Sequence, residues 1–129
     1  MARERSHNDS SVTAELRTLH SPDLSDLRKG PNISDNFCIL IQALIGPHGG
    51  SGEESFGFTV CTPKWLSENL GENEFLFARH YLLVSAYDYD LIFRVINSLC
   101  KSVSGLSWRE VALKLSRYGS WEFEDYRSE

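Results

Sequence analysis

Four histidines are the side chains in this 129-residue sequence best suited to acid–base chemistry near neutral pH, namely His7, His20, His48 and His80. His7 lies in a polar N-terminal stretch and His48 in a glycine-rich turn, so we expect neither to be held rigidly. His80 follows Arg79 at the start of a predicted strand, where a nearby acid could orient it as a catalytic base. A partly buried, hydrogen-bonded histidine is the more common arrangement, and no Gly-x-Ser-x-Gly motif accompanies it. We therefore predict no catalytic residue.

One group of residues could in principle bind a metal ion. His20, Asp23 and Asp26 lie close together in the chain, in a segment rich in turn-forming residues. Their spacing matches no established zinc or calcium motif. Aspartates in such loops ordinarily accept hydrogen bonds from their own backbone. We therefore predict no metal site and no cofactor.

The glycine-rich run at residues 46–52, GPHGGSG, could suggest a phosphate-binding loop. A P-loop needs a lysine after its last glycine, whereas Glu53 and Glu54 follow here, and their carboxylates would repel phosphate. The chain has 18 acidic and 13 basic residues, a net charge of −5. This sign disfavours nucleic acid as a partner, because Lys and Arg must displace counterions from phosphates. It equally disfavours docking on an anionic membrane.

The hydrophobic pattern predicts a single α+β domain over residues 12–129, preceded by a flexible tail at residues 1–11. We expect an antiparallel sheet of about four strands, with two main helices and one short helix packed on one face. The predicted strands are 12–20, 37–45, 55–61 and a buried strand at 80–86. The predicted helices are 63–70, a long helix capped by Asp88 or Asp90 and ending by Gly105, and a helix from Ser107 to near Gly119.

Local signals refine these elements. In the first strand Ala14, Leu16 and Thr18 should share one face. Thr62 followed by Pro63 is typical of a helix start, and Ser107 with Glu110 forms a capping-box pattern. Residues 21–36 should form a loop and residues 71–78 a connector. The alternating end of the chain, residues 121–126, should be an edge strand or an extended segment with Trp121 and Phe123 on one face.

The strands at 37–45 and 55–61 should form a β-hairpin whose apolar faces lie on the same side of the sheet. This register pairs Ile39 with Val60, Ile41 with Phe58 and Cys38 with Cys61. Three cysteines without metal-type spacing, and a polar N-terminus without a secretory signal, indicate the reducing cytoplasm. There, the Cys38–Cys61 pair is more commonly two packed thiols than a redox switch.

Acidic residues concentrate in two stretches of the chain. Residues 53–74 hold five acids against Lys64, a net charge of −4, and residues 119–129 hold four acids against Arg127, a net charge of −3. Solvated surfaces would explain each stretch separately. A binding face for a basic partner would require the two stretches to converge in space, and it would raise association rates more than affinity.

Six sequence segments, taken together and in order, resemble a known family. They are LHSPDL at residues 19–24, IGP at 45–47, ESFGFTVCTPKWL at 54–66, RHYLLVSAYD at 79–88, LC at 99–100 and SWREVALKLSRYGSWEFEDY at 107–126. The chain is similar in these segments to the immunity protein 8 family of bacterial polymorphic toxin systems. The resemblance extends from about Leu16 to Tyr126.

The resemblance implies an α+β domain encoded beside a toxin gene, which protects the producing cell by binding and blocking the cognate toxin domain. Many such toxins are nucleases or other intracellular enzymes, and the family carries over no catalytic residues. A nuclease would present a basic substrate site, which an acidic face could occupy. The residues that we expect to contact the toxin are Glu53, Glu54, Glu122, Glu124 and Asp125.

The sequence thus predicts a cytoplasmic, non-enzymatic inhibitor whose partner is a cognate toxin, with no nucleic acid and no membrane as partners. The free protein should be a monomer or a homodimer. Two alternatives from other classes stay open. One is a small enzyme that uses His80 with a nearby acid, which a deep polar pocket around His80 would support. The other is a generic homo-oligomeric interaction subunit.

Overall fold

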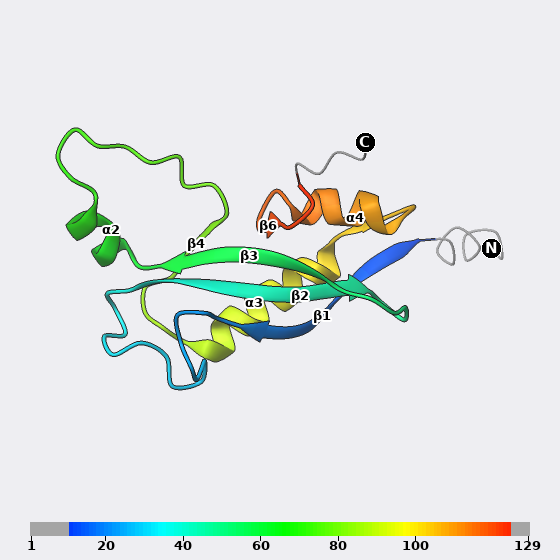
Figure 1. Cartoon of the computed structure of the whole chain (residues 1–129), viewed down its shortest axis with the longest axis horizontal. Coiled ribbons are helices and arrows are strands. Elements are labelled where there is room, and N and C mark those ends of the chain that lie inside the picture. Colours follow the sequence, from blue (N-terminus) through cyan, green and yellow to red (C-terminus); the bar gives the residue numbers. More distant parts are fainter. Residues whose placement is uncertain (1–10, 125–129) are drawn as a thin grey trace.

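A curled, mixed β-sheet organises the computed structural model, which describes residues 11–124 (Figure 1). Within these residues the sheet has six strands: β1 (Val12–His20), β2 (Cys38–Pro47), β3 (Glu54–Cys61), β4 (Tyr81–Leu83), β5 (Ser104–Gly105) and β6 (Ser120–Trp121). Their order is β4-β3-β2-β1-β5, and β6 pairs with β3 beside this path. The described part of the chain also has three helices: α2 (Pro63–Asn69), α3 (Tyr89–Ser102) and α4 (Trp108–Leu115).

The α+β class is as expected, but the prediction of an antiparallel sheet of about four strands is wrong in detail. The strand β4 pairs in parallel with β3, whereas the other pairs are antiparallel. Two very short strands, β5 and β6, also join the sheet. A sequence pattern does not reveal two-residue strands, because no periodicity can be established over so short a segment.

The central hairpin has the predicted register. Ile39 lies opposite Val60, Ile41 opposite Phe58 and Cys38 opposite Cys61. The apolar side chains at alternate positions of β2 and β3 therefore share one face of the sheet. The large apolar side chains of this hairpin form the centre of the core.

The first strand has its predicted bounds but not its predicted face throughout. An irregularity in the pairing of β1 with β2 lies between Leu16 and Thr18. Ala14 and Leu16 face the core before it and Leu19 after it, whereas Thr18 is exposed. A bulge inserts one residue and so reverses the alternation, which corrects the predicted position of Thr18. Arg17, at the bulge, donates from Nη2 to the backbone oxygens of Pro47 (2.8 Å) and Gly50 (3.0 Å).

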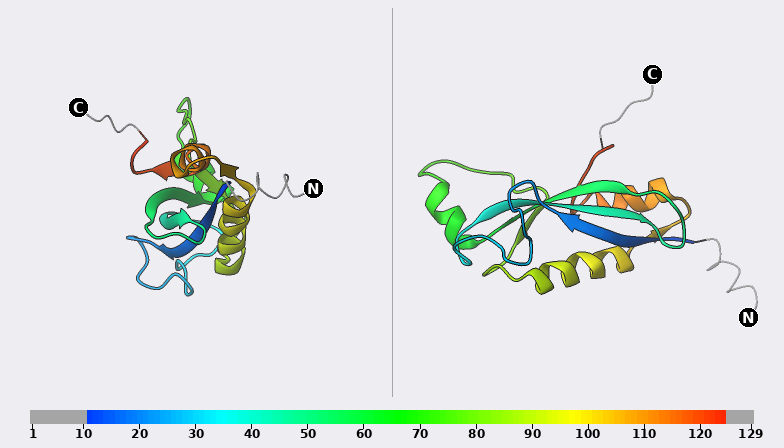
Figure 2. Two further views of the ribbon diagram at one scale, coloured as in Figure 1. Left: turned by 90° about the vertical axis from the view of Figure 1, so that its right-hand side faces the viewer. Right: turned by 60° about the horizontal axis from the view of Figure 1, so that its bottom comes forward.

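The helices α3 and α4 share one core with the apolar side chains of the hairpin, and α3 packs along β1 (Figure 2). Asp88 caps α3 by accepting from the Leu91 amide at 3.1 Å, and Ser107 caps α4 by accepting from the Glu110 amide at 3.2 Å. The Ser107 cap was expected from the sequence, and Asp88 is one of the two candidates that the sequence offered for the cap of α3. The fully buried side chains that the helices contribute are Ile92, Ile96, Cys100, Val111, Ala112 and Leu115.

The short helix α2 starts where predicted, but it lies beyond the end of the β2–β3 hairpin and not over its face (Figure 1). Thr62 caps it by accepting from the Trp65 amide at 3.3 Å, and none of its own residues is buried. The expectation that all three helices pack on one face is therefore wrong for α2. Thr62, which is fully buried and also accepts from the Phe37 amide at 3.3 Å, attaches the start of the helix, and Glu68 Oε1 accepts from Asn36 Nδ2 at 2.8 Å.

The predicted buried strand at 80–86 is reduced to the three residues of β4. Its residues are half-buried or exposed, and the first buried residue after His80 is Val84. His80 itself adopts a left-handed backbone conformation with φ of 66°. The apolar run was correctly seen, but its place at the edge of the sheet leaves one side of β4 unshielded.

At the other end of the chain, β6 confirms the predicted edge strand for two residues. Trp121 is buried, and Phe123 is partly exposed at 37%. The alternation stops there, because residues 121–124 turn, with the Glu124 amide donating to the Trp121 oxygen at 3.0 Å. The predicted N-terminal tail lies outside the described residues apart from Ser11. Among the described helices, none has the length and apolar character to traverse a bilayer.

Candidate functional site

Glu54, one of the acids expected to contact a partner, is engaged inside the molecule. Its Oε1 accepts hydrogen bonds from the indole nitrogens of Trp108 (2.9 Å) and Trp121 (2.8 Å). The three residues come from the start of β3, the start of α4 and from β6, so one carboxylate oxygen joins three elements. Hydrogen bonds to a charged acceptor are stronger than those between neutral groups. The carboxylate therefore has a structural role at this position.

Glu122 lies next to this cluster. Its Oε1 accepts from the Ser55 amide at 2.6 Å, and its own amide donates to the Ser55 oxygen at 3.1 Å. Glu53 is exposed and precedes β3 directly. The structure thus brings Glu53, Glu54 and Glu122 together at the start of β3. The two acidic stretches therefore meet only in part, because Glu68, Glu72 and Glu74 lie in or after α2 at the other end of the molecule.

Glu124 points elsewhere, towards the segment that enters β4. Its Oε2 lies 2.5 Å from Arg79 Nη1, so much of its charge is matched by a cation. Its Oε1 lies 3.6 Å from His80 Nε2, beyond hydrogen-bonding distance, and has no hydrogen-bond partner among residues 11–124. Asp125, the fifth expected residue, lies outside the described part of the chain. The five acids are therefore not one continuous cluster.

His80 holds elements together. Its Nε2 lies 2.8 Å from the Ser116 backbone oxygen, and its own backbone oxygen accepts from the Thr59 amide at 2.9 Å. A carbonyl oxygen can only accept, so Nε2 must carry the proton that is shared with Ser116. This nitrogen is then not free to act as a base while the bond is intact. The histidine links β3, β4 and the end of α4.

A cavity of about 580 Å³ lies beside His80, between α3, β4 and the end of α4. Its lining is mainly apolar, with Phe58, Leu82 and Leu99 among its side chains, and Arg79 and Arg117 also border it. A catalytic histidine was expected to sit in a deep polar pocket. The observed lining instead suits an apolar group.

The loop acids and His20 make bonds within the chain. His20 Nε2 lies 2.9 Å from Gln42 Oε1, Asp23 Oδ2 accepts from the Leu40 amide at 2.8 Å, and Asp26 Oδ1 accepts from the Arg28 amide at 3.0 Å. Within residues 11–124, no three His, Cys, Asp or Glu side chains are placed to share a metal ion.

Cys38 and Cys61 face each other across the hairpin as free thiols. Burial raises the pKa of both, and for Cys61 it raises the pKa to about 11. Burial also raises the pKa of Cys100 to about 12. Because the thiolate is the nucleophilic form, these protonated thiols are poorly suited to nucleophilic catalysis at neutral pH.

One surface was missed at the level of the sequence. The connector after α2 presents Phe75 at 80% exposure, Leu76 at 45% and Phe77 at 87%. We call residues 70–80 the α2–β4 loop. Three large apolar residues in succession, within a segment that belongs to no predicted element, were the signal that could have identified it.

A family model described as Immunity protein 8 matches residues 14–126. No curated protein and no solved structure matches the chain.

Proposed function

Because this chain belongs to the Immunity protein 8 family, we propose that it binds one cognate bacterial toxin domain and neutralises it by occluding the active site. The family implies an immunity protein that acts against a toxin. We further propose that it acts in the cytoplasm of the producing cell, that it needs no cofactor, and that neither nucleic acid nor a membrane is its partner. A nuclease domain is the toxin class that the chain's acidic charge fits best.

The observation that carries this proposal is the extent of the family match, which covers nearly all the described residues. The geometry around His80 suits a structural role, since its Nε2 bonds to the Ser116 oxygen and the adjacent cavity is mainly apolar. Occlusion requires a surface and no chemistry. A stable complex of this kind would bury roughly 800 Å² on each partner.

The acids at the start of β3 supply part of this surface in our proposal. Glu53 is exposed, and Glu54 and Glu122 lie beside it with one carboxylate oxygen each bonded inside the molecule. These two would act mainly through their electric field, which steers a basic partner towards the complex. Glu124 contributes less because Arg79 offsets its charge. Asp125 completes the proposed set.

Co-expression tests the function directly. The toxin domain encoded by the neighbouring gene should arrest growth when expressed alone, and this chain should restore growth and co-purify with the toxin. Failure to restore growth, together with the absence of a complex, would refute the proposed function.

A charge reversal tests the acidic residues separately. Glu53→Lys should slow association with the toxin about tenfold at low salt, with the difference disappearing near 0.5 M salt, because exposed charges act mainly on the encounter rate. The control is Asp90→Lys, an exposed position on α3 that changes the net charge by the same amount. Equal association rates for the two variants would remove Glu53 from the binding face.

A further inference from the structure

We propose that the α2–β4 loop is the apolar anchor by which this protein holds its toxin, an inference that rests on the proposed function. The partner that it fits is a protein domain with an apolar cleft bordered by Lys and Arg. Phe75 and Phe77 would enter this cleft, with the acids around them facing the basic border.

The exposure of the two phenylalanines is the first support for this proposal. At 80% and 87% they are more exposed than any other large apolar side chain in the described residues. Leu76 between them and Leu70 before them are exposed at 45% and 40%. Apolar residues gathered in this way mark interaction sites on soluble proteins, and large aromatic residues are prominent among interface anchors.

The loop is held in shape by its own bonds. The Gly71 amide donates to Glu74 Oε1 at 2.5 Å, the Glu74 amide donates to the Gly71 oxygen at 3.0 Å, and the Arg79 amide donates to the Phe77 oxygen at 2.7 Å. The rings of Phe75 and Phe77 contact each other edge to face, with centroids 5.9 Å apart. An anchor that is ordered before binding loses less conformational entropy on association.

A hollow lies next to the protruding rings. A cavity of about 520 Å³ separates the loop from α2, and the apolar side chains among its lining residues are Trp65, Leu66, Leu70, Phe75, Leu76 and Tyr81. The surface therefore offers both projecting rings and a recess. A folded protein partner can contact both at once.

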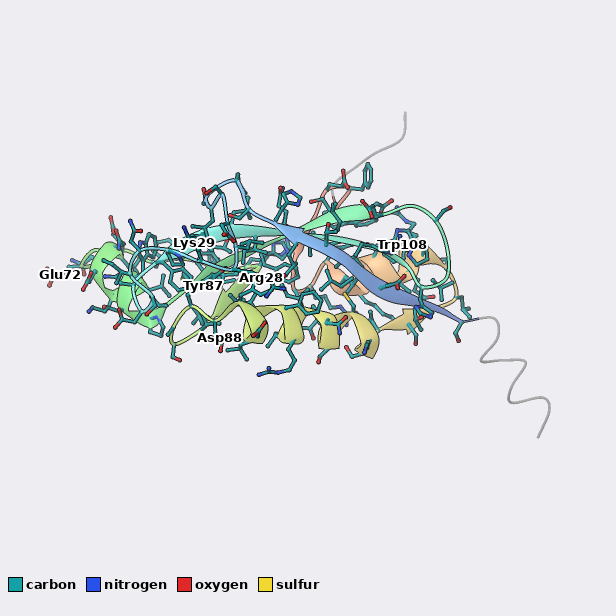
Figure 3. All side chains as sticks on the ribbon, turned by 90° about the horizontal axis from the view of Figure 1, so that it is seen from below. Arg28, Lys29, Glu72, Tyr87, Asp88 and Trp108 are labelled. Atoms are coloured by element: carbon teal, nitrogen blue, oxygen red, sulfur yellow. The ribbon has the colours of Figure 1, made fainter. Side chains whose placement is uncertain are left out.

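The charges around the loop favour a basic partner over a second copy of this chain. Residues 63–78 contain Glu68, Glu72 and Glu74 against Lys64, and Glu72 lies at this end of the molecule (Figure 3). Arg79 is paired with Glu124. Two copies that met through this loop would bring like charges together, which weakens association. A toxin with a basic border would bring opposite charges together.

The test uses the full chain, its Phe75→Ser/Phe77→Ser variant and the purified toxin domain encoded by the neighbouring gene. Hot-spot residues contribute 2 kcal/mol or more, so the loss of each phenylalanine should raise the Kd for the toxin about 30-fold, measured by titration calorimetry. Leu106→Ser is the matched control, because Leu106 is 78% exposed but lies in the turn between β5 and α4. We expect its Kd within about threefold of the parent value and unchanged melting temperatures for both variants.

Three results would overturn the inference while leaving the proposed function in place. The first is a double variant that binds the toxin as tightly as the parent protein. The second is a marked fall in the melting temperature of the double variant, which would show that the rings pack against their own chain. The third is a parent homodimer, detected by light scattering, that the double substitution dissociates. A parent protein that fails to bind the toxin at all would refute the proposed function and this inference with it.

Discussion

The two ends of the molecule use aromatic and acidic side chains in opposite ways (Figure 3). At the start of β3, Trp108 and Trp121 direct their indole nitrogens onto Glu54, so that acids and aromatics hold three elements together. In the α2–β4 loop, Phe75 and Phe77 direct their rings into solvent. The presence of acids and aromatics in a stretch therefore does not by itself show what role the stretch has. The orientation of the side chains decides whether it stabilises the fold or is available to a partner.

If this contrast is correct, substitutions in the cluster at the start of β3 should lower the free energy of unfolding, and substitutions in the α2–β4 loop should leave it unchanged. Trp121→Ala should have the largest effect. Trp121 is buried, its ring stacks on Phe56 with centroids 6.3 Å apart, and it donates to Glu54. We expect a loss of about 3–5 kcal/mol, measured by urea denaturation.

Phe123→Ala provides the control for Trp121→Ala, because Phe123 contacts the Trp121 ring but is 37% exposed. It should have a clearly smaller effect. A loss below about 1 kcal/mol for Trp121→Ala would mean that the C-terminal segment contributes little to the fold.

Glu54→Ala should come next, with a loss of about 1.5–3 kcal/mol, because two indole donors would lose a charged acceptor. Glu54→Gln should lose less, since the amide oxygen can still accept. Urea denaturation of both variants measures the difference. If Glu54→Ala is as stable as the parent protein, Glu54 is a freely available surface acid and the contrast between the two ends does not hold.

Thr62→Ala should lower the free energy of unfolding by about 1–2 kcal/mol, since its hydroxyl oxygen caps α2 and also accepts from the Phe37 amide. Hydrogen exchange should locate part of this loss in α2, which has no buried residue of its own. Ser67→Ala on the same helix, whose hydroxyl donates to the Lys64 oxygen, should change stability little. Equal effects of the two would argue against Thr62 as the attachment of α2.

The buried thiol of Cys61, directly before Thr62, gives a smaller, pH-dependent effect on stability. The pKa of Cys61 is raised by burial from 9.0 to about 11, so the folded protein keeps a proton that the unfolded chain releases near pH 9. Its contribution to stability is therefore complete below pH 9 and declines between pH 9 and 11. Urea midpoints measured from pH 8 to 10 should fall less steeply for Cys61→Ala than for the parent. Identical slopes would contradict a buried, protonated Cys61.

The smallest effect on stability is expected for Phe75→Ser/Phe77→Ser, within about 0.5 kcal/mol of the parent in urea denaturation. Both rings are largely exposed, so their removal withdraws little buried apolar area. This result, set beside the loss expected for Trp121→Ala, would sharpen the contrast between the two ends. A loss comparable with that of Trp121→Ala would abolish the contrast.

Features encoded by neighbouring residues were predictable from the sequence. The bounds of β1, the start of α2 after Thr62 and the capping of α4 by Ser107 all follow from short patterns. The pairing of Cys38 with Cys61 follows from matching two alternating faces across one turn. Each of these depends on contacts within a single element or between elements adjacent in the chain.

Features that depend on distant contacts were not predictable in the same way. The bonds from Trp108 and Trp121 to Glu54 span 54 and 67 residues. The parallel pairing of β4 with β3 and the antiparallel pairing of β6 with the same strand arise from packing that no local period encodes. The exposure of Phe75 and Phe77 follows in turn from where the chain leaves and rejoins the sheet. Their apolar type alone would have suggested burial.

The parallel pairing of β3 with β4 has one more consequence. Parallel neighbours cannot be joined by a tight turn, so the chain must leave the sheet after Cys61 and travel back before Tyr81. The entropy of closing such an excursion rises only slowly with its length. Residues between 71 and 78 can therefore be inserted, removed or exchanged while every strand keeps its register, because the bonds that tie the segment to the sheet begin at Arg79 and His80. The topology leaves this segment free to diversify without rebuilding the fold, which is what the proposed anchor would need in order to follow a changing toxin.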